Sequence, residues 1–119
     1  MSPKEVVSNW VKAFNSGDAD LIAGLYSPDA INFQVAEGEV RGRDSIKARF
    51  SEEFAAADMV CIVENLFEEG EWAILEWKDP LGLRGSGFFH VVEGLIIYQR
   101  GYWDKLSFLR QHNLPIPRE

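Results

Sequence analysis

The sequence predicts an α+β fold, in which three N-terminal helices pack on one face of a strongly curved, mainly antiparallel sheet. Two observations support this fold class. Apolar residues recur at helical spacing in the first part of the chain, and four long extended segments follow one another after residue 58. The chain has 119 residues, of which 46% are hydrophobic, so a single domain spanning residues 1–119 is expected.

The first helix is predicted from "SPKEVVSNWVKAFNSGD". Ser2 fits the N-cap position, and Glu5 completes a capping box with it. Trp10 and Phe14 share one apolar face of this helix, and Gly17 fits its C-terminal stop. The sequence therefore places two large aromatic side chains on the face that turns toward the sheet.

A second, short helix is expected to carry Tyr26 on its apolar side and to end at Pro28, because proline cannot continue the helical hydrogen bonds. Residues 30–35 suit a strand, and "AEGE" suits a turn that leads to a short return strand. The third helix is predicted from apolar residues spaced four apart in "RDSIKARFSEEFAAA", namely Ile46, Phe50 and Phe54.

The second half of the chain reads as four strands. They are predicted from "MVCIVENLFEE" and "EWAILEWKD", joined around Gly70, and from "LRGSGFFHVVEG" and "LIIYQRGYWDKL", joined around "EG". Tight connections between consecutive strands indicate an antiparallel meander. Three helices over such a sheet leave a cone, whose open end is the natural place for a ligand.

Composition excludes several classes of function. The formal charge is −7, without a basic stripe, so neither nucleic acid nor an anionic membrane is an expected partner. A single cysteine, Cys61, excludes an internal disulfide, and the two histidines lie too far apart to suggest a metal site. The opening "MSPKEVV" lacks the apolar core of a signal peptide, so a cytoplasmic protein is expected. Neither a metal ion nor another cofactor is expected.

Two long segments carry a family resemblance: "WVKAFNSGDADLIAGLYSPDAINF" near the start and "VEGLIIYQRGYWDKLSFLRQHNLP" near the end. Together with "EVRGRDSIKARF" and "AILEW" between them, they resemble the nuclear transport factor 2-like superfamily, and within it the SnoaL-like (polyketide cyclase-like) family. The resemblance implies a cystatin-like cone. It leaves function open, since the superfamily includes isomerases, cyclases, epoxide hydrolases and non-catalytic binding modules.

The catalytic groups of ketosteroid isomerase-like members are missing. Trp10 stands at the position of their helix tyrosine, Gln34 at that of the strand base, and Gly87 near that of the second aspartate. Limonene-epoxide hydrolase-like members use an Asp-Arg-Asp arrangement. Here Asp79 and Asp104 match the two aspartates, but Trp77 replaces the arginine, and two close carboxylates without a cation are costly to keep ionised.

Asp104, in "YWD", resembles the single acid/base aspartate of SnoaL-like cyclases. The resemblance implies that Asp104 is catalytic and points into the cone, with its pKa raised by desolvation. The alternative is a strand-end carboxylate that caps a turn. Residues expected to bind the substrate are the aromatic and polar groups of the pocket: Trp10, Phe14, Tyr26, Asn32, Gln34, Trp77, Phe88, His90 and Tyr102.

Alternation along the last strand puts Tyr98, Arg100, Tyr102 and Asp104 on one face. An inward Arg100 would be costly, and a bulge at Gly101 would allow it to face water while Asp104 faces the pocket. The outer face of the sheet is expected to be apolar, so we expect a homodimer through this face, formed by residues such as Trp72, Ile74, Ile97 and Trp103.

The leading hypothesis is a protein that binds an apolar small molecule, or a cofactor-independent acid/base enzyme of the cyclase or isomerase kind that acts on a carbonyl-bearing ligand. Two alternatives stay open. One is a non-catalytic module that binds a ligand or a partner protein, and the other is an epoxide hydrolase-like enzyme.

Overall fold

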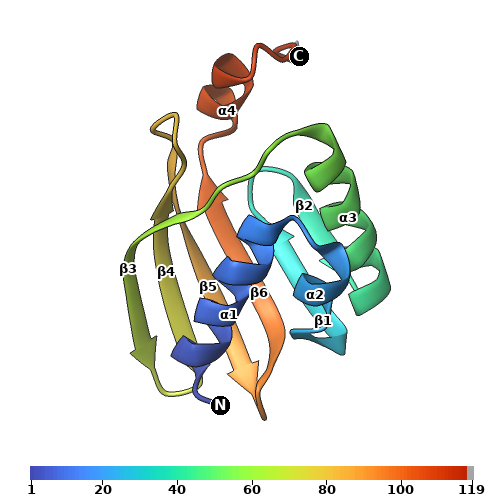
Figure 1. Cartoon of the computed structure of the whole chain (residues 1–119), viewed down its shortest axis with the longest axis vertical. Coiled ribbons are helices and arrows are strands. Elements are labelled where there is room, and N and C mark those ends of the chain that lie inside the picture. Colours follow the sequence, from blue (N-terminus) through green and yellow to red (C-terminus); the bar gives the residue numbers. More distant parts are fainter. Residues whose placement is uncertain (118–119) are drawn as a thin grey trace.

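The computed structural model describes residues 1–117, and in this part of the chain it contains helices on one side of a six-stranded sheet (Figure 1). The helices are α1 (Pro3–Ser16), α2 (Ala19–Ala23), α3 (Arg43–Ala56) and α4 (Lys105–Gln111). The strands are β1 (Tyr26–Gln34), β2 (Gly38–Arg41), β3 (Ile62–Glu69), β4 (Trp72–Lys78), β5 (Arg84–Val92) and β6 (Leu95–Trp103).

The strands lie in the order β2-β1-β6-β5-β4-β3. The pairing of β1 with β6 is parallel, and the other pairings are antiparallel. α1 crosses the middle of the sheet and contacts β3, β4 and β5, whereas α3 covers β1 and β2 (Figure 1). The predicted α+β fold, with three N-terminal helices on a curved and mainly antiparallel sheet, is confirmed.

The two ends of α1 follow the sequence signals. Ser2 and Glu5 form the complete capping box of α1, and Gly17 ends the helix with a left-handed φ of 69°. α2 is shorter than expected, and Tyr26 belongs to β1 instead. Pro28 is accommodated in β1 because the pairing with β6 is irregular between Tyr26 and Ile31, so no ladder hydrogen bond is required there.

α4 is the element that the sequence analysis missed. It lies beyond the end of the sheet, on the side of the β4–β5 connection (Figure 1). Phe108 packs against Trp103 with 5.4 Å between ring centroids, and the Gln111 amide donates a hydrogen bond to the carbonyl oxygen of Leu81. These two contacts hold α4 against the ends of β6 and of the β4–β5 loop.

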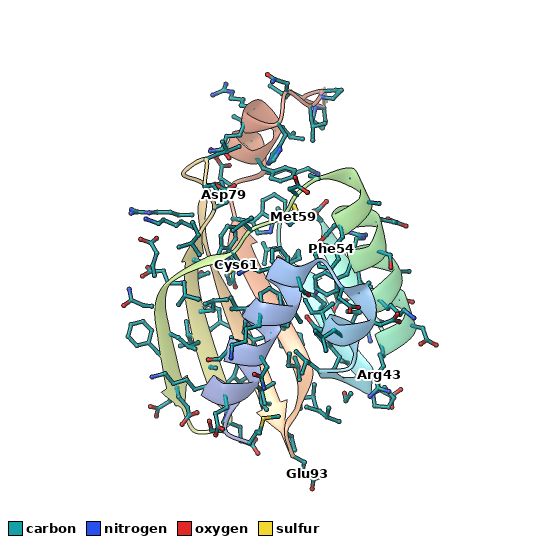
Figure 2. All side chains as sticks on the ribbon, viewed as in Figure 1. Arg43, Phe54, Met59, Cys61, Asp79 and Glu93 are labelled. Carbon is teal, nitrogen blue, oxygen red and sulfur yellow. The ribbon has the colours of Figure 1, made fainter. Side chains whose placement is uncertain are left out.

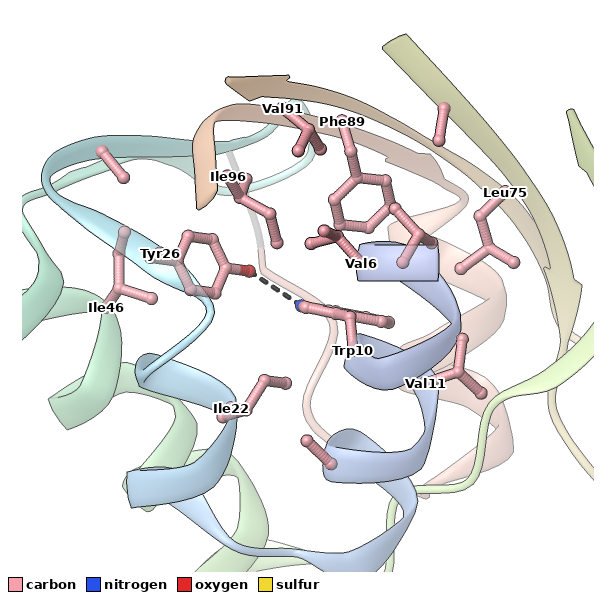
Figure 3. Close-up of a cluster of buried hydrophobic side chains, with 14 of the residues drawn as sticks. Val6, Trp10, Val11, Ile22, Tyr26, Ile46, Leu75, Phe89, Val91 and Ile96 are labelled. Carbon is pink, nitrogen blue, oxygen red and sulfur yellow. Dashed lines mark hydrogen bonds between the residues drawn. The ribbon is translucent and has the colours of Figure 1, made fainter. Parts of the chain in front are cut away.

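The hydrophobic core lies between the helices and the inner face of the sheet (Figure 3). Trp10 is its centre, with ring centroids 5.2 Å from both Phe14 and Phe89. Val6 and Tyr26 are fully buried beside it. Trp10 therefore packs in the core, as aromatic residues on the apolar face of an amphipathic helix usually do.

The sheet register corrects the predicted bulge. Gly101 pairs regularly with Gly87, and the irregularity lies instead near Ile97, where the pairs His90–Tyr98 and Val91–Ile96 leave one extra residue. Arg100 faces outward without a bulge at Gly101, since the inner positions of β6 are taken by its neighbours in the alternation.

No helix in the described residues is long and apolar enough to cross a membrane.

Candidate ligand site at the open end of the cone

The open end of the cone is the end at which β1, β4 and β6 finish and toward which α3 runs (Figure 1). Phe54 and Met59 lie toward this end, together with Asp79, and Glu93 lies at the opposite end (Figure 2). Phe54 stacks on Phe50 and lies edge-on to Phe14, with centroid distances of 5.7 and 5.6 Å. These rings form an aromatic wall on the helix side.

The predicted pocket residues divide between the two faces of the sheet. Trp77 faces inward, packed against the core with Ala73 and Leu75 beneath it, as predicted. Asn32 and Gln34 also face inward, on β1. Trp10, Phe14 and Tyr26 belong to the core or its edge. The inward group thus comprises six of the nine residues expected to bind the substrate.

Phe88, His90 and Tyr102 face outward, and their prediction as inward-facing pocket residues is wrong. β5 pairs with β4 so that Ala73 lies opposite Phe89. Because Ala73 is on the inner face, Phe89 is too, and the intervening residues of β5 face solvent. The Phe88 ring lies edge-on to Tyr102 at 6.0 Å.

His90 stacks on Trp72 on the outer face, with ring centroids 4.6 Å apart, and its Nε2 lies 2.9 Å from Oε1 of Glu71. It has no part in the cone. His112 lies near α4, against Phe108. No group of three potential metal ligands occurs among the described residues.

Asp104 does not point into the cone. It is exposed and caps α4, where its side chain accepts a hydrogen bond from the backbone N–H of Ser107. The hydroxyl group of Ser107 also donates to it, and these bonds hold the pKa of Asp104 below its ordinary value. The prediction of an inward carboxylate with a raised pKa is therefore wrong. The helix-capping signal of an Asp before "KLSF" explains the position.

Asp79 is the turn residue that the sequence indicated. Its carboxylate accepts hydrogen bonds from the backbone N–H groups of Leu81 and Leu83, both at 2.9 Å. It therefore shapes the β4–β5 loop. The two aspartates of the epoxide hydrolase-like arrangement both serve as caps, and neither faces Trp77 across the cone.

A buried polar chain joins α1 to the sheet. The indole N–H of Trp10 donates to the hydroxyl oxygen of Tyr26 at 2.9 Å, and the Tyr26 hydroxyl donates to Oε1 of Gln99 (Figure 3 shows the first bond). Burial raises the pKa of Tyr26, so its phenol stays neutral. Each group in this chain is satisfied by its neighbour, which indicates a structural role.

A second polar group lies on the inner face nearer the open end. The indole N–H of Trp103 donates to Oε1 of Gln34 at 3.0 Å, and Nε2 of Gln34 donates to Oδ1 of Asn32 at 2.8 Å. Trp103 had been expected on the outer face, and this bond corrects that prediction. A side chain at Gly101 would collide with Gln34, so glycine is needed for Gln34 to lie across β6.

Asn32 keeps an unused hydrogen-bond donor. Its side chain is only 7% exposed, and its oxygen accepts from Gln34. None of the described residues accepts a hydrogen bond from its amide nitrogen. This amide nitrogen is not among the buried side-chain atoms that lack a hydrogen-bond partner, so it is accessible to water. Asn32 thus presents an amide N–H to water on the inner face of β1.

Glu53 is the functional candidate that the sequence analysis missed. It lies on the inner side of α3, half-buried, and burial raises its pKa from 4.5 to about 7. Its spacing from Ile46 and Phe50 is the signal that could have revealed it, because residues three and seven positions apart share a helix face.

The interior of the cone is largely filled by side chains. A Cβ atom on Gly85 would overlap the Trp77 ring, which lies flat over β5. Two surface hollows lie outside the cone. One is on the outer face near Arg84 and Tyr102, and the other is beside the start of α1, near Lys4.

Comparison with known proteins supports the fold. Residues 7–99 match the family of SnoaL-like domains. No curated protein matches the sequence. Among solved structures, a protein of ketosteroid isomerase-like fold from Catenulispora acidiphila, in complex with trimethylamine, superposes with a TM-score of 0.85 at 18% identity. The match covers 97% of this chain and 96% of that one.

Two further structures are similar. IdmH, a putative polyketide cyclase from Streptomyces antibioticus, has a TM-score of 0.79 at 20% identity and covers 96% of this chain and 100% of its own. The epoxide hydrolase/cyclase-like enzyme SalBIII, which acts in pyran ring formation in salinomycin, has a TM-score of 0.77 at 19% identity, covering 87% and 92%. At these identities the likeness shows the fold alone.

Proposed function

The chain belongs to the SnoaL-like domain family, and from this premise we propose that it binds an uncharged, largely apolar small molecule at the open end of the cone. The observation that carries the proposal is the amide N–H of Asn32 on the inner face of β1, which has no partner in the described residues and is accessible to water. Apolar walls with a few directed polar groups are typical of ligand sites. Here Trp77 and Phe54 supply the apolar walls.

The amide N–H of Asn32 is accessible to water and is therefore open to an acceptor on a ligand. The Trp103–Gln34 bond alone would tie β6 to β1, and an apolar residue at position 32 would fill the core without a free donor. A ligand with a carbonyl, hydroxyl or ether oxygen would satisfy this donor. The aromatic side chains around it would bury the rest of the ligand.

A second candidate function is cofactor-independent acid/base catalysis of the cyclase or isomerase kind. The half-buried Glu53 favours it, because a carboxyl group with a pKa near 7 suits proton transfer at neutral pH. Polyketide cyclases among the structurally similar proteins agree with this chemistry. Epoxide hydrolysis by an aspartate pair is not proposed, since Asp79 and Asp104 cap a loop and a helix.

For the outer face of the sheet we propose that a second copy of the chain is the partner. No helix of the described residues covers this face, and large apolar side chains such as Phe67 and Tyr102 are exposed there, at 55% and 42%. Nε of Arg100 is buried among aromatic rings and has no hydrogen-bond partner in the described residues. A facing subunit would cover the rings and supply an acceptor. The cytoplasmic location and the lack of a cofactor stay predictions.

The ligand proposal can be tested with 2-acetylnaphthalene, an uncharged aromatic ketone, by ¹H–¹⁵N NMR of the indole N–H groups. We expect the signal of Trp103, whose indole lies in the Gln34 network, to shift with saturation, and the signal of Trp72 on the outer face to stay in place. Asn32→Leu should weaken binding about three- to tenfold, as the loss of one hydrogen bond does. Shifts confined to Trp72 would contradict the proposal.

A further inference from the structure

Arg100 is a cation without an acceptor on the outer face of the sheet. Its guanidinium carbon lies 5.1 Å from the centroid of the Phe88 ring, 5.9 Å from that of Tyr98 and 5.8 Å from that of Tyr102. Its Nε is buried and has no hydrogen-bond partner in the described residues, and none of their carboxylates forms an ion pair with it. A buried N–H group without an acceptor is unfavourable, so an acceptor from outside the chain would stabilise it.

A hollow with an unbalanced negative charge lies on the same face, and the Tyr102 ring borders both. The hollow is lined by Glu64, Glu76, Arg84, Gly85, Ser86 and Tyr102. Arg84 is paired with Glu64 at 3.1 Å, whereas Glu76 accepts a hydrogen bond from the Asn65 amide at 2.6 Å and has no cation beside it in the described residues. The carboxylate of Glu76 can therefore accept a charge-assisted hydrogen bond from a guanidinium group.

Strand pairing fixes where Arg100 and Glu76 lie relative to each other. Two neighbouring rows of paired residues cross β4, β5 and β6, one of Glu76, Ser86 and Tyr102 and the other of Ile74, Phe88 and Arg100. Arg100 and Glu76 are therefore opposite corners of a patch that is roughly 10 Å wide across the strands and about 7 Å long, from the strand spacing and the rise of two residues. Ile74 and Tyr102 are the other two corners.

This patch is self-complementary under a two-fold rotation. In a face-to-face dimer the two-fold axis lies between the two sheets. An axis that bisects the line from Arg100 to Glu76 places each of these residues over the other in the partner, so that two identical contacts form at once. The same axis passes close to Ile74 and Tyr102, so the residues that meet their own copies there are uncharged.

Building on the homodimer proposed above, we propose that Arg100 of each subunit enters the hollow of the other and pairs with Glu76 of the partner subunit. The pair gives the guanidinium group an acceptor and balances the charge of the hollow. Because Nε of Arg100 is already buried in the single chain, part of the cost of removing this cation from water is not added on association. The two pairs set the register in which the sheets meet, as charged groups across an interface do.

Charge-reversal variants test the pair by sedimentation equilibrium. Arg100→Glu brings two carboxylates together at each contact, and Glu76→Arg brings two guanidinium groups together. Each variant alone should raise the dissociation constant of the dimer by about 30-fold or more, the usual effect of breaking a close charge pair in an interface. Mixed together, the two variants should associate with nearly the wild-type constant, because every contact in the mixed dimer joins opposite charges.

Glu69→Arg is the matched control for a general attraction between chains of different charge. It changes the net charge as much as Glu76→Arg does. Glu69 is also exposed on the outer face, opposite Trp72, but it lies at the other end of β3 from the hollow. Binding is followed with the Arg100→Glu chain carrying a fluorescent label at its N-terminus. The Glu69→Arg chain should bind it no more tightly than the wild-type chain does, and the Glu76→Arg chain should bind it at least about tenfold more tightly.

Thermal unfolding checks that each variant is folded. If Arg100→Glu does not fold, two milder substitutions replace the charge reversal. Arg100→Met keeps the packing against the rings, and combining it with Glu76→Gln should weaken the dimer no more than Arg100→Met does alone, because the pair is already broken.

The outcomes separate the pair from the dimer. If the wild-type chain dimerises but the two charge-reversed chains bind each other no more tightly than Arg100→Glu binds the wild-type chain, the homodimer stands and the pair is wrong. Dimerisation of Arg100→Glu as strong as that of the wild type, or equal rescue by Glu69→Arg, would also overturn the pair. With the milder substitutions, additive losses would overturn it. A monomeric wild-type protein would remove both the homodimer and the pair.

Discussion

The indole N–H of Trp103 donates a hydrogen bond to Oε1 of Gln34 at 3.0 Å, which joins the end of the last strand to the end of the first. These two residues are 69 positions apart in the chain. The parallel pairing of β1 with β6 brings them together, because Gln34 lies opposite Gly101. The bond orients the side chain of Gln34, whose Nε2 donates a hydrogen bond to Oδ1 of Asn32.

Removing the donor of this bond should destabilise the fold. Trp103→Phe leaves the half-buried oxygen of Gln34 without its indole partner, so we expect the free energy of unfolding to fall by about 1–2 kcal/mol, measured by urea denaturation. Trp72→Phe on the outer face is the matched control. Trp72 donates no such bond in the described residues, so a smaller loss is expected there. An equal loss of unfolding free energy in both variants would show that the effect comes from the smaller ring and not from the lost hydrogen bond.

The raised pKa of Glu53 predicts that stability falls as pH rises. Glu53 holds its proton up to about pH 7 in the folded state, whereas in the unfolded chain it ionises near its ordinary value of 4.5. Between these values the folded state binds more protons, so Glu53 makes the protein progressively less stable from about pH 4.5 to 7. Glu53→Gln should therefore stabilise the protein at pH 8, by roughly 2–3 kcal/mol, and have little effect at pH 4.

This prediction is checked by urea denaturation of both proteins at pH 4 and pH 8. Glu69→Gln, at an exposed position of β3, serves as the control and should change stability little at either pH. A pH-independent effect of Glu53→Gln would mean that the Glu53 carboxyl group titrates normally in the folded protein.

The cap of α4 makes Asp104 a local structural residue. Asp104→Ala removes the side-chain acceptor for the backbone N–H of Ser107, so we expect faster hydrogen exchange of the amides at the start of α4. Binding of 2-acetylnaphthalene should be unchanged, because the carboxylate is exposed and faces away from the cone. A loss of binding in Asp104→Asn, which preserves the shape of the cap, would instead restore Asp104 as a site residue.

Asn15 joins the end of α1 to the chain just before β3. Its Oδ1 accepts from the backbone N–H of Cys61 at 2.7 Å, and its Nδ2 donates to the carbonyl oxygen of Cys61 at 3.0 Å. Asn15→Ala should lower the free energy of unfolding by about 1–2 kcal/mol. Asn9→Ala, in the same helix, corrects for the higher helix propensity of alanine. If the two variants are equally stable, the Asn15 bonds contribute nothing net.

The homodimer prediction is tested by sedimentation at micromolar concentration. We expect a dimer of the wild-type chain, and a monomer for Tyr102→Glu, because the new charge would be buried against the partner's sheet. Leu21→Glu is the control, since Leu21 is similarly exposed, at 55%, but lies on α2, away from the outer face. A monomeric wild-type protein would remove the proposal.

The sequence by itself determined the fold class and the two ends of α1. Signals such as the capping box of Ser2 and Glu5 act within a few residues, so they can be read without knowing the fold. The same holds for Gly17 and for the turn at Asp79. The order of helices and strands also predicted the cone and a ligand at its open end, and the family resemblance implied the same cone.

Only the tertiary structure decided which residues face the cone. Alternation predicts two faces for a strand but not which is inward, and the pairing of Ala73 with Phe89 sent Phe88 and His90 outward. Strand pairing also brought Trp103 to Gln34, and helix packing turned Glu53 toward the core. These placements depend on contacts between distant segments, and they explain the raised pKa of the Glu53 carboxyl group and the helix-capping role of Asp104.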